Sequence, residues 1–231
     1  DPYGKERWIE LKPVDVVIVG AGVVGSAIAW KLARYEVDVV VIDKESDVAC
    51  GTSKANSGIV HAGYNDEPGS LMAKLCVQGN AMIWELAKEL DIPHRQTGSL
   101  VVAHSEQAIA ILKKLEEQGR ANGVSDLEIL GKDELREIEP NLHDSVVAAL
   151  YAPSAGVVTP YELTIGLAEN AADNGVSFLF NAAVTTIERC DDHLVVKTGK
   201  GEIATRFVLN CAGTSCDLVG EMVGEHLPII L

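Results

Sequence analysis

A glycine-rich turn near the start of the chain constrains the fold more than any other feature of the sequence. The turn is Gly20-Ala21-Gly22-Val23-Val24-Gly25, and it directly follows the run Val14-Asp15-Val16-Val17-Ile18-Val19. That run is β-branched and almost continuously apolar, as a strand buried on both faces must be. A helical pattern from Ser26 to Tyr35 and a second buried strand from Val37 to Ile42 follow. This order of elements predicts an α/β fold with a parallel sheet.

The spacing of the glycines predicts a dinucleotide site within this unit. Gly20 would make the tight turn, Gly22 would let the backbone approach a pyrophosphate, and Gly25 would let helix and strand pack closely. The helix N-terminus would face the anion. Asp43 ends the second strand, where a carboxylate accepts hydrogen bonds from ribose hydroxyls. Because this carboxylate would repel a 2′-phosphate, NADP is disfavoured, while NAD and FAD both stay open.

The next segment favours FAD over a nicotinamide cofactor. A nicotinamide-binding domain usually returns at once into another helix and strand, but residues from Cys50 to Tyr64 are small and polar. Within them, Gly51-Thr52-Ser53-Lys54-Ala55-Asn56-Ser57-Gly58 offers hydroxyls, amides and backbone donors. Such a segment can contact a pyrophosphate from a second side and approach a flat ring. The alternatives are a polar loop without a ligand and a nicotinamide-dependent dehydrogenase.

The middle of the chain predicts further helices and one strand. A long helix is expected from Gly69 to Leu90, with its apolar side made by Leu71, Leu75, Ile83, Leu86 and Leu90. We expect a strand from Gly98 to Ala103, a helix capped by Ser105 that runs to Gly119, and a short helix from Lys132 to Glu139 that Pro140 ends.

The last third of the chain predicts a helix followed by an antiparallel meander. Thr159-Pro160-Tyr161-Glu162 is a capping box that starts a helix ending at Asn174-Gly175. A strand from Val176 to Phe180 should follow. Three short antiparallel strands are expected at Val184–Glu188, Leu194–Lys197 and Glu202–Ala204, and another buried strand at Arg206–Asn210.

Charge and cysteine content exclude several classes of protein. The formal net charge is −15, so nucleic acid is disfavoured as a partner. Apolar runs fall well short of the roughly 18 residues that cross a bilayer, and residues 1–12 lack the features of an export signal. Five cysteines without a C-x-x-C pair argue against a disulfide scaffold or a zinc site. We expect a soluble, cytoplasmic protein without a metal site or a transmembrane segment.

Both ends of the sequence suggest a fragment. The chain begins at Asp1 without an initiator Met and stops at the apolar, strand-like run Leu227-Pro228-Ile229-Ile230-Leu231. Since natural termini are usually polar and frayed, we expect a longer parent protein.

Together these motifs resemble the FAD-dependent oxidoreductases of the D-amino acid oxidase superfamily. The resemblance rests on Gly20–Gly25, Asp43, Gly51-Thr52-Ser53-x-x-Asn56-Ser57-Gly58-x-x-His61 and Asn210-x-Ala212-Gly213, and it extends from about Val14 to Gly220. FAD-linked glycerol-3-phosphate and L-2-hydroxyglutarate dehydrogenases are the most similar branches, because Pro68-Gly69-Ser70-Leu71-x-Ala73-x-Leu75-Cys76 and Gly156-Val157-Val158-Thr159-Pro160 also fit them.

The resemblance implies which residues bind FAD. Gly20, Gly22 and Gly25, with Val23 and Val24 between them, would hold the pyrophosphate, and Asp43 with Lys44 the adenosine ribose. Thr52 and Ser53 would meet phosphate, Asn56, Ser57 and Gly58 would lie along the flavin, Val184 would pair with adenine, and Ala212-Gly213 would pack against the cofactor. Asp43 stands where many relatives have Glu. Relatives also continue well beyond residue 231, so the remaining substrate wall would lie outside this sequence.

The implied fold is a Rossmann-like FAD-binding domain, with a parallel sheet and a three-stranded antiparallel meander, beside an incomplete α+β substrate domain. The FAD-binding domain would comprise residues 1–90 and 156–225, the substrate-side domain residues 91–155, and residues 226–231 would begin the rest of the substrate domain. Because His61 directly follows the flavin segment, it would be the base that accepts the substrate's hydroxyl proton, or else a structural or cofactor-contacting histidine.

The implied activity is hydride transfer from a secondary alcohol to flavin, with glycerol 3-phosphate as the first choice of substrate. L-2-hydroxyglutarate, or another 2-hydroxy or amino acid, is the alternative. A third possibility is a cofactor-binding fragment without turnover of its own. Quinone, oxygen or an iron–sulfur partner would all suit as electron acceptor, and membrane association through the missing region stays open.

Overall fold

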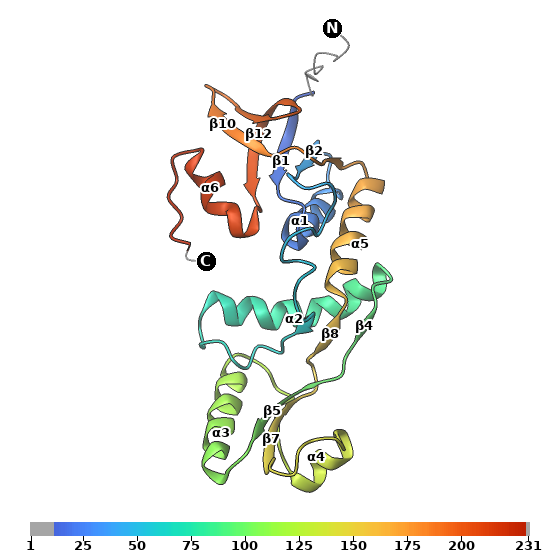
Figure 1. The fold of residues 1–231 in the computed structure, drawn as a ribbon, viewed down its shortest axis with the longest axis vertical. Coiled ribbons are helices and arrows are strands. Elements are labelled where there is room, and N and C mark those ends of the chain that lie inside the picture. Colours follow the sequence, from blue (N-terminus) through green and yellow to red (C-terminus); the bar gives the residue numbers. More distant parts are fainter. Residues whose placement is uncertain (1–11, 230–231) are drawn as a thin grey trace. The chain divides into compact units, whose positions relative to one another are not determined.

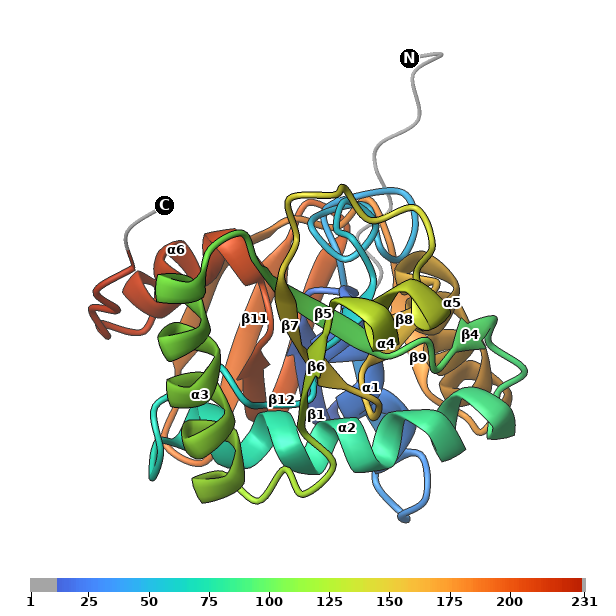
Figure 2. The same ribbon diagram turned by 90° about the horizontal axis from the view of Figure 1, so that it is seen from below.

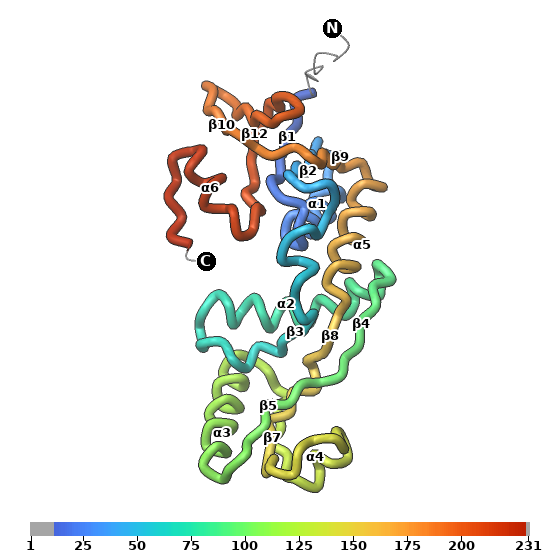
Figure 3. Tube along the Cα trace, viewed as in Figure 1, coloured from blue at the N-terminus to red at the C-terminus, as the bar shows by residue number. Residues whose placement is uncertain are grey.

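The computed structural model describes residues 12–229, which form two compact units. The first unit is assembled from two stretches of chain, up to Asn56 and from Pro160 onward, and the second unit is Ser57–Thr159. The trace in Figure 3 shows the chain leaving the first unit after the early strands and returning to it at α5. The domains expected from the sequence have other boundaries, at residues 90 and 156, and their assignment by function stays a prediction.

The first unit contains a six-stranded sheet in the order β10-β11-β12-β1-β2-β9. The parallel strands are β1 (Val14–Val19), β2 (Val39–Ile42) and β9 (Ser177–Leu179), together with the second half of β12 (Gly201–Asn210). The first half of β12 pairs antiparallel with β11 (Leu194–Thr198), which pairs with β10 (Val184–Arg189). The predicted α/β class, with its parallel sheet and three-stranded meander, is confirmed.

Strands β1 and β2 are buried because apolar clusters cover both faces of the sheet. Val16, Ile18, Val39 and Val41 point to one face, where they pack with Ala29 of α1 (Val23–Leu32) and Ala171 of α5 (Pro160–Asp173). Val17, Val19, Val40 and Ile42 point to the other face, where they meet the meander and Val219 of α6 (Cys216–Glu221). The alternation of side chains along a strand explains this division. Figure 1 shows α1 and α5 side by side.

Two expectations for the first unit need correction. Helix α1 begins at Val23 rather than Ser26 and ends at Leu32 rather than Tyr35, because the helix starts directly after the turn glycines. The strands expected at Glu202–Ala204 and Arg206–Asn210 are one continuous strand, β12. Its second half is only partly buried, and Phe207 is 55% exposed.

The second unit holds two small antiparallel sheets. One has the order β3-β8-β4, from Ile59–Val60, Gly156–Val158 and His94–Arg95, and the other has the order β5-β7-β6, from Ser99–Ala103, Ala148–Ala152 and Glu128–Gly131. Helix α3 (Glu106–Ala121) and helix α4 (Lys132–Ile138) cover opposite faces of the β5-β7-β6 sheet (Figures 1 and 2). Ser105 caps α3 as predicted, since its Oγ accepts the N–H of Ala108. Of these strands, the sequence predicted β5 alone.

Helix α2 (Leu71–Glu89) forms where it was predicted, but its apolar side differs from the expected one. Leu71 and Leu75 are 69% and 55% exposed, and Met72 and Met82 are also exposed. The fully or largely buried residues of α2 are Ala73, Asn80 and Ala87. The Asn80 side chain donates hydrogen bonds to the carbonyls of His61 and Ser154, so a polar residue helps to anchor this helix.

The end of the chain also differs from expectation. Leu227–Ile229 has no regular secondary structure, and Ile230 and Leu231 lie outside the described residues, as do residues 1–11. Within residues 12–229, no helix is long and apolar enough to span a membrane.

Candidate functional site

A cavity of about 410 Å³ opens in the first unit at the carboxyl ends of β1 and β2. In parallel α/β sheets this is the edge where ligands bind. Its volume lies within the range of small-molecule sites. Four segments line it: the glycine-rich turn, residues 42–53, the turn before β10, and residues from Cys211 to Met222.

Two glycines of the turn, Gly20 and Gly25, are required by close backbone contacts. Gly20 has φ +109°, and a Cβ there would lie 2.3 Å from the carbonyl oxygen of Cys211. A Cβ on Gly25 would lie 1.9 Å from the carbonyl oxygen of Gly20, inside the packing of α1 against β1. Gly22 is different, because the nearest atom to its Cβ would be the Ser53 Oγ at 3.1 Å. Gly22 therefore leaves the backbone open toward the cavity.

Asp43 holds the glycine-rich turn in place. One carboxylate oxygen accepts the N–H of Ala21 at 2.6 Å, and the other accepts the N–H of Glu45 at 2.9 Å. The N–H of Ala49 in turn donates to the carbonyl of Ala21 at 3.1 Å. A carboxylate oxygen has two acceptor positions, so Asp43 keeps capacity to accept hydroxyl groups from the cavity.

The N-terminus of α1 offers hydrogen-bond donors to an anion. Its N-cap residue is Gly22, which has no side chain to accept the first N–H groups. Ser53 supplies the missing acceptor: its Oγ accepts the N–H of Val23 at 2.9 Å. The N–H groups of the first helical turn lack intrahelical acceptors, and the helix dipole favours negative charge there. The site is therefore suited to a phosphate or diphosphate.

The turn after β12 closes the cavity from the other side. The Asn210 side chain donates to the carbonyl of Cys216 at 2.7 Å, and its Oδ1 accepts the N–H of Ala212 at 3.3 Å. The N–H of Cys211 donates to the carbonyl of Val19. These bonds tie the Ala212-Gly213 turn to the end of β1, next to Gly20.

The structure brings together most of the residues that the sequence predicted for the cofactor. Eleven of them line the cavity: Gly20, Gly22, Val23, Val24, Asp43, Lys44, Thr52, Ser53, Val184, Ala212 and Gly213. Gly25 lies behind the wall as a packing residue. Asn56 lies outside the lining, and Ser57, Gly58 and His61 belong to the second unit.

The sequence did not predict that α6 and Cys211 form part of the cavity wall. Leu218, Val219 and Met222 line the cavity, as do Cys50 and Cys211. The apolar residues Leu218, Val219 and Met222, which closely follow Ala212-Gly213 in the sequence, were the available signal. Sequence alone did not show that α6 folds back onto the carboxyl ends of the strands.

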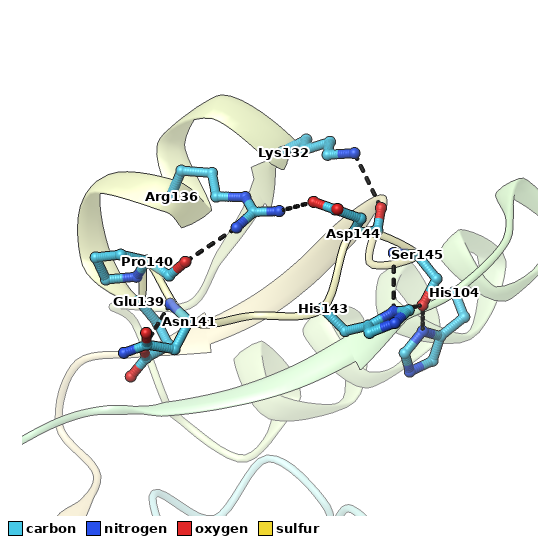
Figure 4. A network of polar contacts seen from close by, with 9 residues as sticks. All are labelled: His104, Lys132, Arg136, Glu139, Pro140, Asn141, His143, Asp144 and Ser145. Carbon is cyan, nitrogen blue, oxygen red and sulfur yellow. Dashed lines mark hydrogen bonds and ion pairs between the residues drawn. The ribbon is translucent and has the colours of Figure 1, made fainter.

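All six histidines lie outside the cavity lining. His104, His143 and His226 are exposed, and His94 and His193 are half-buried. Figure 4 shows that the Nδ1 atoms of His104 and His143 both contact the Ser145 Oγ, each at 2.9 Å. Beside them Arg136 pairs with Asp144. Residues 12–229 contain no group of three or more His, Cys, Asp or Glu side chains that could hold a metal ion.

The Cys211 thiol should react slowly with alkylating reagents. Burial raises the pKa of the Cys211 thiol, so less of the reactive thiolate is present at neutral pH. With iodoacetamide at pH 7.5, peptide mapping by mass spectrometry should show modification at Cys211 well after the exposed Cys190. Raising the pH above the usual range of a thiol should still accelerate the reaction at Cys211. Equal labelling rates at pH 7.5 would contradict this expectation.

Fold and site together define a class of protein: an α/β protein that binds a nucleotide cofactor through its diphosphate. The glycine-rich turn, the α1 N-terminus, the Ser53 hydroxyl and the Asp43 carboxylate form the donor and acceptor set of such a site.

Comparison with known proteins then identifies the family. Residues 15–231 match the family described as FAD dependent oxidoreductase, and the chain belongs to this family. It is 45% identical to a glycerol 3-phosphate dehydrogenase of Caloramator mitchellensis over 212 residues, which cover 92% of this chain and 44% of that protein. It is 33% identical to the human mitochondrial L-2-hydroxyglutarate dehydrogenase, covering 96% of this chain and 50% of that protein. The chain thus spans about half the length of these relatives.

Solved structures agree with the sequence relatives. The L-alpha-glycerophosphate oxidase of Mycoplasma pneumoniae, with FAD bound, matches with a TM-score of 0.85 at 29% identity, covering 92% of this chain and 57% of that one. The glycine oxidase of Geobacillus kaustophilus matches with the same TM-score and identity, covering 92% and 58%. FAD is therefore the cofactor that both the family and the cavity support. The fit rests on Gly22, which leaves the backbone open toward the cavity, and on the α1 N–H groups and the Ser53 hydroxyl beside it.

Proposed function

We propose that this chain is part of an FAD-dependent dehydrogenase that oxidises the secondary alcohol of glycerol 3-phosphate to the ketone of dihydroxyacetone phosphate. The observation that carries this choice is the 45% identity to a glycerol 3-phosphate dehydrogenase along 92% of the chain. The cavity supports the cofactor half of the proposal, because its residues provide the contacts that a flavin dinucleotide needs.

The residues of the first unit would bind and orient the cofactor. The N–H groups at the start of α1 and the Ser53 hydroxyl would hold the diphosphate, and the Asp43 carboxylate would accept hydrogen bonds from the adenosine ribose. The α6 wall would exclude water from the apolar part of the cavity through Leu218 and Met222. Bound FAD would supply the acceptor for the hydride of the carbinol carbon, and a base of the protein would take the hydroxyl proton.

His61 is the residue that we propose as this base. Its backbone is fixed, since the carbonyl accepts a hydrogen bond from Asn80, while its side chain is exposed. An imidazole has an unperturbed pKa close to working pH, which suits proton transfer from an alcohol. The alternatives are a histidine that contacts the cofactor and one that serves the structure.

Replacing His61 tests this role in the intact enzyme loaded with FAD. His61→Gln retains hydrogen-bonding groups but cannot accept the proton, so kcat should fall by about 100-fold or more. The flavin absorbance spectrum and the FAD content should stay as in the wild type. A loss of FAD content with unchanged turnover per bound flavin would assign His61 to cofactor binding instead.

The substrate proposal is tested by anaerobic mixing of the intact, FAD-loaded enzyme with candidate alcohols. Glycerol 3-phosphate should bleach the flavin bands, because hydride transfer reduces the flavin. L-2-hydroxyglutarate serves as the comparison at the same concentration. If glycerol 3-phosphate leaves the flavin oxidised while L-2-hydroxyglutarate bleaches it, the substrate choice is wrong and the FAD assignment stands.

L-2-hydroxyglutarate is the second candidate substrate, because L-2-hydroxyglutarate dehydrogenases are similar to this chain over about the same share of its length. The human protein is 33% identical over 96% of the chain. Other 2-hydroxy acids and amino acids fall in the same class, since the similar solved structures include glycine oxidases. Quinone, oxygen and an iron–sulfur partner stay open as the final electron acceptor.

The chain of 231 residues is also proposed to bind FAD without turning over substrate by itself. This rests on its span of about half the length of its relatives. Steady-state turnover by the 231-residue chain alone would contradict this part of the proposal.

A further inference from the structure

The segment from Gly51 to Asn56 is a compact turn that one side chain holds together. The N–H groups of Lys54 and Ala55 donate to the carbonyls of Gly51 and Thr52, at 3.4 and 3.1 Å. The Asn56 Nδ2 donates to two successive carbonyls, that of Thr52 at 3.0 Å and that of Ser53 at 3.1 Å. One amide group thus fixes the carbonyls of the two peptide bonds that flank Ser53.

Ser53 carries the hydroxyl that caps α1 from a distant part of the chain. The Ser53 Oγ accepts the N–H of Val23, which lies 30 residues earlier. Because Gly22 cannot cap the helix with a side chain, the position of Ser53 decides how this N–H group is satisfied. An Oγ that accepts the Val23 N–H still has its own proton, which it can donate toward the cavity.

Thr52 and Ser53 line the cavity, whereas Asn56 does not. The Asn56 amide is hydrogen-bonded to the carbonyls of the two residues that face the cavity. The expectation that Asn56 lies along the flavin stays a prediction.

We infer that Asn56 is a positioning residue for the cofactor: it sets the orientation of Ser53, which binds both the N-terminus of α1 and the FAD diphosphate. The inference rests on the proposed FAD site. It assigns to Asn56 an effect on FAD affinity that passes through the orientation of Ser53.

A double-mutant cycle tests this chain of contacts in the 231-residue protein. Ser53→Ala removes the capping oxygen, and Asn56→Ala removes the amide without adding charge. Each should raise the FAD Kd by about 10-fold, the size expected for one lost hydrogen bond to a charged group. The double variant should bind within about two-fold of the weaker single variant, because the two residues act in series. FAD fluorescence quenching gives the Kd values, and Asn65→Ala, in an exposed turn, is the control.

Amide hydrogen exchange of Val23 in the FAD-free protein gives a second readout that does not depend on the cofactor. Exchange at Val23 should accelerate in both single variants and should not accelerate further in the double variant. If Asn56→Ala fails to fold, Asn56→Ser replaces it, since a serine hydroxyl is too short to reach both carbonyls.

Three results would overturn the inference. Kd effects that multiply in the double variant would mean that Asn56 acts on FAD binding by a route other than Ser53, such as Thr52, whose carbonyl it also binds. An Asn56→Ala protein with unchanged Kd and unchanged Val23 exchange would mean that the turn holds Ser53 without the amide. If the wild type does not bind FAD, the cofactor assignment fails and this inference fails with it, whereas the first two results leave that assignment intact.

Discussion

Gly25→Ala should strongly destabilise the protein, because the added methyl group would clash with the backbone of the glycine-rich turn. The added Cβ would lie 1.9 Å from the carbonyl oxygen of Gly20 and 3.3 Å from the Cγ2 of Ile18. Neither α1 nor β1 can move away freely, because Ile18 and Ala29 are completely buried between them. We expect a loss of about 3 kcal/mol or more in the free energy of unfolding, at the upper end of overpacking effects. Urea denaturation followed by circular dichroism measures it.

Two further glycine variants separate stability from binding. Gly199→Ala adds a methyl in the β11–β12 turn, where no atom lies within 4 Å, and should leave the unfolding midpoint unchanged. Gly22→Ala meets the Ser53 Oγ at 3.1 Å, a contact that a small side-chain shift relieves, so the protein should fold. Its methyl would stand at the backbone that faces the cavity, so FAD should bind more weakly. A Gly25→Ala protein as stable as Gly199→Ala would contradict the packing described here.

Asp43→Asn should weaken FAD binding by about 10- to 100-fold. The two carboxylate oxygens accept the N–H groups of Ala21 and Glu45. The asparagine side chain would keep one acceptor oxygen and place its NH₂ group against one of these two backbone N–H groups. The turn would therefore lose an acceptor, and the ribose would lose a charged hydrogen-bond partner. Hydrogen bonds to charged groups contribute about 1.5–3 kcal/mol, which corresponds to this change in Kd. Isothermal titration calorimetry with FAD measures the Kd.

The matched control for Asp43 is Asp191→Asn. Asp191 is exposed in the turn between β10 and β11, and its replacement changes the net charge of −15 by the same amount. Its FAD Kd should equal that of the wild type within about two-fold. If both variants weaken binding equally, the effect of Asp43 is one of overall charge and not of its contacts.

The sequence predicted best those features that depend on residues close together in the chain. The glycine-rich turn and the capping serine of α3 are recognised from residues close together in the sequence, and both features are present in the structure. The contacts of Gly20 with Cys211 and of Asp43 with Ala21 join distant parts of the chain and did not follow from the sequence. The binding roles of these residues stay predictions. Strand β12 was split in two, because a strand that pairs antiparallel with one neighbour and parallel with another has no simple alternation. The α6 wall was missed because its contact with the cavity depends on tertiary folding.

For helix α2 the sequence predicted the position of the helix but not which of its residues are buried. Its leucine spacing correctly predicted a helix, but the residues that anchor it include the buried Asn80, whose side chain bonds to two carbonyls. Periodicity identifies which residues share a face. It does not identify what that face packs against, and Leu71 and Leu75 are exposed.

The most direct test of the central claim is whether the purified 231-residue chain retains FAD. The chain is incubated with excess FAD, separated from free flavin by gel filtration and examined by absorbance. Because the cavity is formed by one compact unit, the account predicts flavin bands that elute with the protein at close to one FAD per chain. It also predicts that ADP competes for the site. A folded protein that elutes without flavin and shows no binding of FAD or ADP would contradict the assignment of the cavity.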